Sequence, residues 1–208
     1  ALYVVATSAT AAATVLEKVA PEASRIYSAA EILPLVTTTV FYPRETAKVR
    51  GLGCLFPQNQ GFRVLGVLMN PFIFSNRSQL ASETWIFGGG RDGAAFKLTD
   101  EEIIQKISEE RVRLHKGNVL EKPLKYNIQR WPQSLPHYTV EHEKRLKSLE
   151  PHLEQLKTKK IFVVGNHTGT LGLARILEAS EKLPNEAAAL DKPIGVLLMN
   201  LGTPESPD

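Results

Sequence analysis

Short β-branched and aromatic runs dominate the region between residues 33 and 90. Glycine, proline, asparagine and glutamine separate these runs, which cover residues 35–42, 53–56, 63–69 and 84–87. Short strands divided by turn-forming residues are typical of an antiparallel sheet. The pattern therefore predicts one such sheet in the first half of the chain.

Helical patterns lie on both sides of this region. Residues 1–6 form a β-rich run, and the alanine-rich residues 9–18 predict a helix that Pro21 ends. Thr99 precedes three acidic residues, as is typical of a helix N-terminus, and this helix is expected to continue to Gly117. These helices are expected to cover the sheet.

The second half of the chain repeats strand and helix signals. Residues 125–131 predict a strand, Pro132 and Pro136 a turn, and residues 140–149 a charged helix. Residues 181–191 are polar and alanine-rich, and they predict a linker.

Residues 161–177 carry the most informative local pattern. An apolar run gives way to glycines, Gly165 and Gly169 among them, and then to an apolar helix. This order predicts a strand, a tight turn and a helix N-terminus. Glycines there let a ligand lie against the backbone, and first-turn N–H groups can face a pyrophosphate or a carbonyl oxygen. A strand-to-helix junction also favours small residues for packing alone, so a purely structural role stays open.

Both ends of the sequence indicate a piece of a longer polypeptide. The chain opens directly in a β-rich run, and residues 194–202 have the pattern of a buried strand followed by a short polar segment. A lone strand cannot bury both of its faces. We therefore expect part of the core to lie outside this sequence.

The composition narrows the class of protein. Of 208 residues, 43% are hydrophobic and 23% are charged, which suits a soluble globular core. The net charge is +3 and the basic residues are scattered, so nucleic acid is not an expected partner. No apolar run is long enough to span a membrane, which leaves contact with a membrane surface open. The single cysteine, Cys54, excludes an internal disulfide; it is expected to be a buried small hydrophobe in a reducing, cytoplasmic compartment.

Residues 88–93 match the pattern G-x-G-x-x-G of dinucleotide-binding proteins. That fingerprint requires a helix directly after the glycines and an acid about 20 residues later on a second strand. Here residues 94–98 have an extended pattern and the next helix begins near Asp100. A glycine-rich strand end, where a neighbouring backbone passes close, is the preferred interpretation.

Other catalytic patterns are missing from the sequence. The loop after Gly165 lacks the lysine and hydroxyl of a nucleoside triphosphate site, and no G-x-S-x-G motif marks a nucleophile. The histidines do not match a metal-ligand spacing and are expected to be packed or solvated; they are His137, His142, His152 and His167. No catalytic side chain or metal ligand is predicted, which suits an enzyme whose reactive atoms belong to an organic cofactor.

Residues 1–180 resemble the C-terminal part of oxygen-dependent protoporphyrinogen oxidases, a family of flavoproteins of haem biosynthesis. The matching segments are 4–9, 51–57, 65–66, 70–77, 88–89, 164–166 and 171–173. The most specific match is Trp131 with residues 135–142, although His137 and Glu141 replace the family's glutamine and glycine. Thr168, Thr170 and Arg175 also depart from the family pattern.

The resemblance implies an FAD cofactor bound jointly with a missing N-terminal half, and a porphyrinogen substrate between the flavin and an antiparallel sheet. Hydride would pass from the tetrapyrrole to the flavin, which oxygen reoxidises. Gly165 and Asn166 are expected near the ribityl chain and pyrophosphate, and Trp131 either lines the flavin cavity or packs in the core. The remaining expected flavin contacts are Thr170, Leu171, Gly172 and Leu173, the last three through backbone N–H groups.

Residues 192–204 resemble the opening strand of ferrochelatases, which act on the product of that oxidation. The implied organisation is an oxidase part at residues 1–180, a linker at 181–191 and the start of a ferrochelatase-like domain at 192–208.

The expected fold class is α+β: an antiparallel substrate sheet with covering helices, plus a C-terminal remnant of an FAD-binding α/β domain. The expected activity is FAD-dependent oxidation of protoporphyrinogen to protoporphyrin, which the isolated piece would not perform. Two alternatives stay open: another flavoprotein of the amine oxidase superfamily, and a non-catalytic binding or scaffold module.

Overall fold

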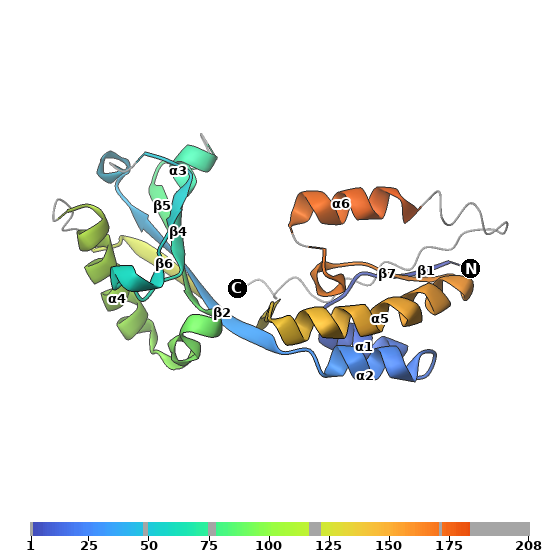
Figure 1. Cartoon of the computed structure of the whole chain (residues 1–208). Helices are drawn as coiled ribbons and strands as arrows, with labels where there is room; N and C mark the ends of the chain where they lie inside the picture. Colours follow the sequence, from blue (N-terminus) through green and yellow to red (C-terminus); the bar gives the residue numbers. More distant parts are fainter. Residues whose placement is uncertain (1, 48–49, 75–77, 117–121, 171, 184–208) are drawn as a thin grey trace. The chain divides into compact units, whose positions relative to one another are not determined.

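The computed structural model describes residues 2–47, 50–74, 78–116, 122–170 and 172–183. The chain divides into two compact units (Figure 1). Unit 1 combines Ala1–Glu31 with Pro136–Asp208, and unit 2 is the continuous segment Ile32–Leu135.

Unit 2 is built on a five-stranded sheet with the order β3-β4-β5-β2-β6. The pairs β2–β5, β4–β5 and β3–β4 are antiparallel, so the predicted antiparallel sheet is confirmed. Its strands are β2 (Ile32–Tyr42), β3 (Gly53–Leu55), β4 (Gly66–Met69), β5 (Ala81–Gly88) and β6 (Lys125–Pro136).

Helix α4 (Asp100–Leu114) covers one face of this sheet. Its N-terminus carries the expected cap, in which the Thr99 hydroxyl accepts from the Glu102 N–H and the Glu102 carboxylate accepts from the Thr99 N–H. Ile103 and Ile107 are completely buried against strand residues such as Val40 and Trp85. Because side chains alternate along a strand, every second strand residue points away from α4. This side of the sheet is called the outer face. The outer face carries Thr37, Thr39, Phe41, Leu55, Gly66, Leu68, Ser82, Thr84 and Ile86.

The core of unit 2 also contains a buried ion pair. Arg111 of α4 donates from Nε to the Glu83 carboxylate of β5 at 3.0 Å, and the Trp85 indole donates to the same carboxylate at 3.1 Å. The guanidinium lies over the Tyr42 ring, 3.6 Å from its centroid. Because burial of an unpaired charge is costly, these partners fix the position of α4 on the sheet.

Unit 1 contains two parallel strands and four helices among the described residues. Strand β1 (Tyr3–Val5) pairs with β7 (Ile161–Val163), with Val4 opposite Phe162. The helices are α1 (Ala9–Leu16), α2 (Pro21–Ser28), α5 (Val140–Thr158) and α6 (Leu173–Glu181). Helix α2 packs against both α1 and α5 (Figure 1).

The roles of two prolines differ from what the sequence predicted. Pro21 does not only close the alanine-rich region, because it is the first residue of α2, where its missing N–H has no helical partner to lose. The strand at residues 125–131 does not turn at Pro132 but continues as β6 to Pro136. β6 is an edge strand of its sheet, and an edge strand tolerates proline.

Helix α5 is longer than the predicted residues 140–149, and it passes through Pro151 to Thr158. A proline inside a helix costs about 3 kcal/mol. Leu149 and Leu156 are buried on the two sides of Pro151, and each contributes about 1.5–3 kcal/mol, which offsets that cost.

Two further boundaries differ from the prediction. Residues 94–98 are not extended, since Gly93–Lys97 form a 3₁₀ turn in which the Ala95 N–H donates to the Asp92 carbonyl. Glu181 is the last residue of α6 rather than the start of a linker. Residues 184–191 of the expected linker and the ferrochelatase-like segment 192–208 lie outside the described residues. None of the helices in the described part of the chain is both long and apolar enough to cross a membrane.

Candidate functional site

The loop at residues 164–172 leaves the carboxyl ends of the two parallel strands of unit 1. The Val164 N–H donates to the Val5 carbonyl at 3.0 Å, which extends the pairing of β7 with β1 to the start of the loop. A 3₁₀ turn at Asn166–Thr168 follows, and α6 begins at Leu173. Loops at the carboxyl ends of parallel strands are the usual ligand-binding positions in open α/β sheets.

His167 fixes this loop to the segment after β1. Its side chain is buried, and Nε2 lies 2.8 Å from the Thr7 carbonyl, with the Tyr27 ring edge-on against the imidazole. Burial lowers the pKa of His167, and the Thr7 carbonyl opposes this only in part, so the ring is neutral and Nε2–H donates. The sequence could not predict this hydrogen bond, because Thr7 and His167 are 160 residues apart.

Gly165 is required by the same packing. Its φ is 144°, and a Cβ at this position would lie 3.0 Å from the His167 ring nitrogen. Asn166 follows, and its carbonyl accepts a hydrogen bond from the Tyr138 hydroxyl at 3.4 Å. The loop is therefore held by Tyr138, which precedes α5, and, through the His167 ring, by Tyr27 of α2.

The N-terminus of α6 is open. Gly172 has a φ of 84°, no atom lies within 4 Å of a Cβ built on it, and no side chain caps the helix. Within the described residues, the first-turn N–H groups, beginning at Leu173, therefore have no capping side chain. Leu171, the remaining predicted residue of this stretch, lies outside the described residues.

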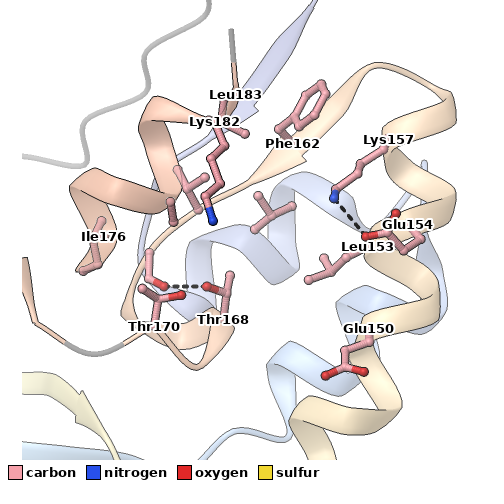
Figure 2. A pocket seen from close by; sticks show the side chains of 14 residues that line it. Glu150, Leu153, Glu154, Lys157, Phe162, Thr168, Thr170, Ile176, Lys182 and Leu183 are labelled. Atoms are coloured by element: carbon pink, nitrogen blue, oxygen red, sulfur yellow. Dashed lines mark hydrogen bonds and ion pairs between the residues drawn. The ribbon is translucent and has the colours of Figure 1, made fainter. Parts of the chain in front are cut away.

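A cavity of about 280 Å³ lies beside the loop, between α5, β7 and α6. Gly165 and Thr170 form part of its wall, and the ammonium group of Lys182 points into it (Figure 2). On the α5 side, Lys157 pairs with Glu154 at 2.9 Å (Figure 2). The lining combines apolar side chains with the hydroxyls of Thr168 and Thr170, and two lysines are balanced by two glutamates, Glu150 and Glu154. This set suits a ligand with both polar and apolar parts.

Trp131 belongs to unit 2. It lies on β6, is 37% exposed, and donates from its indole nitrogen to the Thr37 hydroxyl of the outer face at 3.0 Å. The interpretation of Trp131 as an ordinary core residue is therefore wrong. Its predicted position beside the flavin stays a prediction.

The outer face of unit 2 contains an apolar pocket, here called the leucine pocket. It has a volume of about 310 Å³ and is lined by Leu52, Leu55, Leu68, Ile73 and Ile86. Gly53 and Gly66 form its floor: a Cβ on Gly53 would lie 2.3 Å from the Val67 carbonyl oxygen, and one on Gly66 2.7 Å from that of Cys54. Leu55 is 85% exposed, which the apolar pattern could not indicate, because the same pattern is typical of buried strands.

The glycines at residues 88–93 have the structural role that was preferred for them. Gly88 ends β5 with a φ of 99°, and a Cβ there would lie 2.9 Å from the Pro34 carbonyl oxygen. A 3₁₀ turn, not the start of a helix, follows at Gly89–Arg91. Gly88 therefore allows the backbones of β5 and β2 to approach closely.

The histidines occupy separate environments. His142 is buried, and His137 lies 2.9 Å from the Glu31 carboxylate. Among the residues that the structure describes, no three His, Cys, Asp or Glu side chains gather in a group that could hold a metal ion. Cys54 is only partly buried and packs against the core of unit 2.

A curated relative can be aligned with most of this chain at low sequence identity. The chain is 25% identical to protoporphyrinogen oxidase 1, chloroplastic, of Arabidopsis thaliana over 158 residues, which are 71% of this chain and 29% of the relative. The chain thus spans less than a third of that relative's length.

Two solved structures share the fold. One, from Exiguobacterium sp. 255-15 and provisionally named a protoporphyrinogen oxidase, has a TM-score of 0.67 at 17% identity and covers 92% of this chain and 41% of that one. The other, cyclohexylamine oxidase from Brevibacterium oxydans, has a TM-score of 0.61 at 14% identity and covers 91% of this chain and 43% of that one. These likenesses confirm the predicted fold class.

The family described as "Flavin containing amine oxidoreductase" matches residues 1–180, both described units included. The match covers far more than half of the 208 residues. The chain belongs to the flavin-containing amine oxidoreductase family.

Proposed function

We propose that this chain is part of an FAD-dependent oxidase that converts a porphyrinogen into a porphyrin. The observation that carries the proposal is the leucine pocket on the outer face of the sheet, in a chain of a flavin-dependent family. The similarity to a protoporphyrinogen oxidase supports the same substrate class.

The loop of unit 1 fits the cofactor. The open first turn of α6 offers N–H groups from Gly172 and Leu173 to carbonyl or phosphate oxygens, and the exposed backbone at Gly172 leaves room for close approach. Lys182 adds a positive charge in the neighbouring cavity, and Thr170 adds a hydroxyl. When bound, FAD supplies the acceptor for hydride from a carbon–hydrogen bond.

The leucine pocket fits a flat, apolar macrocycle. Its wall is aliphatic, and its glycine floor lets a planar group approach the strand backbones. Among the described residues, its lining contains no Asp or Glu that could pair with the ammonium group of an amine substrate. The side chains here would exclude water from the substrate and orient it, while the chemistry depends on the cofactor.

The test is substrate oxidation by the purified full-length gene product. Protoporphyrinogen IX is added in air, and the fluorescence of protoporphyrin and the release of hydrogen peroxide are followed. Cyclohexylamine and benzylamine are assayed in parallel. Porphyrin formation coupled to oxygen consumption is expected. Oxidation of the amines alone, or porphyrin binding with no oxidation of any substrate, would contradict the proposal.

A charged substitution tests the pocket itself. Leu55→Asp places a carboxylate in the apolar wall, and we expect it to raise the KM for the porphyrinogen about tenfold, equivalent to roughly 1.4 kcal/mol. Because Leu55 is highly exposed, folding should be little affected. Leu124→Asp changes another exposed leucine, 62% exposed against 85% for Leu55, which lies outside the pocket and serves as the control.

A further inference from the structure

A second hollow on the outer face of unit 2 is lined by polar and aromatic side chains. This arginine pocket has a volume of about 310 Å³, and its lining includes Phe41, Arg44, Asn70, Phe74, Ser78 and Ser82. Phe41 lies at the end of β2, and Arg44 begins the 3₁₀ turn that follows it. The other residues come from the short helix α3 (Asn70–Ile73), the chain after it and the start of β5.

Asn70 connects the Ser82 hydroxyl of the arginine pocket to two threonine hydroxyls outside its lining. Asn70 Nδ2 donates to the Ser82 hydroxyl at 3.2 Å and to the Thr84 hydroxyl at 2.9 Å, and Thr84 lies 3.0 Å from the hydroxyl of Thr39. Because the Ser82 oxygen accepts from Asn70, its own O–H is available to donate to a ligand. The pocket therefore presents a donor on its floor.

Arg44 supplies a positive charge at the rim. Its Nη1 donates to the Ser78 carbonyl at 2.7 Å, which fixes one edge of the guanidinium. Within the described residues, Nε and Nη2 make no hydrogen bond and no carboxylate pairs with Arg44. A fixed guanidinium with free N–H groups beside a hydroxyl is complementary to a carboxylate.

The leucine pocket and the arginine pocket are built on the same two elements, α3 and β5. Ile73 of α3 and Ile86 of β5 line the leucine pocket, while Asn70 of α3 and Ser82 of β5 line the arginine pocket. Ile86 and Ser82 are four residues apart on one strand, a distance of about 13 Å at the usual rise. A ligand that spans them has a broad apolar body and an acidic arm.

We propose that Arg44, with Ser82, binds a carboxylate side chain of the macrocyclic substrate whose apolar body occupies the leucine pocket. This inference rests on the proposed function and adds to it the residue that selects for an acidic substrate. Arg44 is a specificity-determining residue in this assignment, because it contacts the acidic arm and not the ring carbons that are oxidised.

The test measures binding without turnover, so that it does not depend on oxidase activity. Mesoporphyrin IX, which carries two free carboxylates, and its dimethyl ester are titrated against the full-length protein by fluorescence quenching. Arg44→Met is expected to weaken binding of the diacid about tenfold and to leave binding of the ester unchanged. Arg44→Lys should retain part of the affinity for the diacid, since it keeps the charge but not the planar N–H fork.

The controls separate a local effect from a general one. Arg50→Met removes an exposed arginine that does not line either pocket, and it should leave both affinities unchanged. Ser82→Ala should weaken binding of the diacid by a smaller factor than Arg44→Met. An equal loss for diacid and ester, or no loss for either, would overturn the assignment of Arg44.

The outcomes also distinguish this inference from the proposed function. Carboxylate-dependent porphyrin binding without oxidation of any porphyrinogen would refute the oxidase proposal and keep the role of Arg44. Oxidation of protoporphyrinogen that Arg44→Met leaves unchanged, together with an unchanged affinity for the diacid, would refute the role of Arg44 alone. A parent protein that binds neither porphyrin would refute both.

Discussion

Glu83 and Arg111 show how one buried pair links a helix to a sheet. Burial alone would raise the pKa of Glu83, but the His115 ring 3.8 Å away and the charge and hydrogen bonds of Arg111 outweigh it and lower the pKa. The carboxylate therefore stays charged, and its partners must stay in place. A pair of this kind contributes little when intact but is costly to break on one side.

Removal of Arg111 tests this balance. Arg111→Met leaves a buried carboxylate without its main partner, and we expect a loss of about 3–5 kcal/mol in the free energy of unfolding. The double variant Glu83→Gln/Arg111→Met should recover most of this loss. Urea unfolding followed by tryptophan fluorescence measures both. Glu143→Gln, in an exposed pair with Lys147, is the control and should leave the midpoint unchanged.

The same pair predicts acid sensitivity. Because the pKa of Glu83 is lower in the folded chain than its ordinary value of 4.5, its contribution is complete above that pH and is lost as the pH falls through the lowered pKa. Thermal unfolding of the parent and of Glu83→Gln, compared at several acidic pH values, measures this contribution. A steep loss that is identical in the two proteins would contradict it.

We expect His167 to cause a second dependence of stability on pH, at higher pH than that of Glu83. Its pKa is lowered from the ordinary value of 6.5, so protonation favours the unfolded chain as the pH falls below 6.5, while stability above that pH is unaffected. His167→Gln keeps an N–H donor but cannot titrate, and it should reduce this dependence. Burial also lowers the pKa of His142, which should cause the rest of this pH dependence. The double variant His142→Gln/His167→Gln should therefore lack the dependence. Melting temperatures between about pH 7.5 and 5.5 test this, with His152→Gln as the control.

At the scale of elements, the pairing of β3 with β4 depends on glycine. A Cβ on Gly66 would lie 2.7 Å from the Cys54 carbonyl oxygen of the partner strand, and backbone cannot move aside as a flexible side chain does. We expect Gly66→Ala to cost about 1–3 kcal/mol and to reduce amide protection of β3, as measured by hydrogen exchange. Gly93→Ala, where a Cβ meets nothing within 4 Å, should change stability by less than about 0.5 kcal/mol. Equal effects of the two alanines would contradict this account.

Elements with strong local signals were predictable from sequence. The β-branched and aromatic runs at residues 35–42 and 84–87 predicted strands within β2 and β5, and the cap at Thr99 predicted the start of α4. The errors at Pro132 and near Pro151 have different causes: an edge strand tolerates Pro132, and the burial of Leu149 and Leu156 outweighs the helix-breaking effect of Pro151. The glycine loop at Gly165 was found because turn chemistry is local, whereas the contact of His167 with Thr7 and the exposure of Leu55 depend on the fold.

At the scale of the whole molecule, unit 2 is continuous and unit 1 is not. Unit 2 has its own buried core around Trp85 and its own sheet, and it needs no strand from unit 1. A segment with a separate core and its own sheet is expected to fold alone.

We therefore predict that the isolated segment 32–135 folds. It should show a cooperative unfolding transition and a β-rich circular dichroism spectrum, and Arg111→Met should destabilise it as it does the full chain. The matched fragment 1–31 provides β1 without β7 and should remain unfolded. An unstructured 32–135 segment would show that its core depends on unit 1.

The pairing of β1 with β7 also sets an order of events during synthesis on the ribosome. Residues 3–5 are translated before unit 2, but their parallel partner at 161–163 is translated only after all of unit 2. Unit 2 can therefore fold co-translationally while β1 waits unpaired, and the glycine loop after β7 is completed last. A nascent chain from which unit 2 has emerged, but not β7, would consequently carry a folded sheet while β1 still lacks its partner strand.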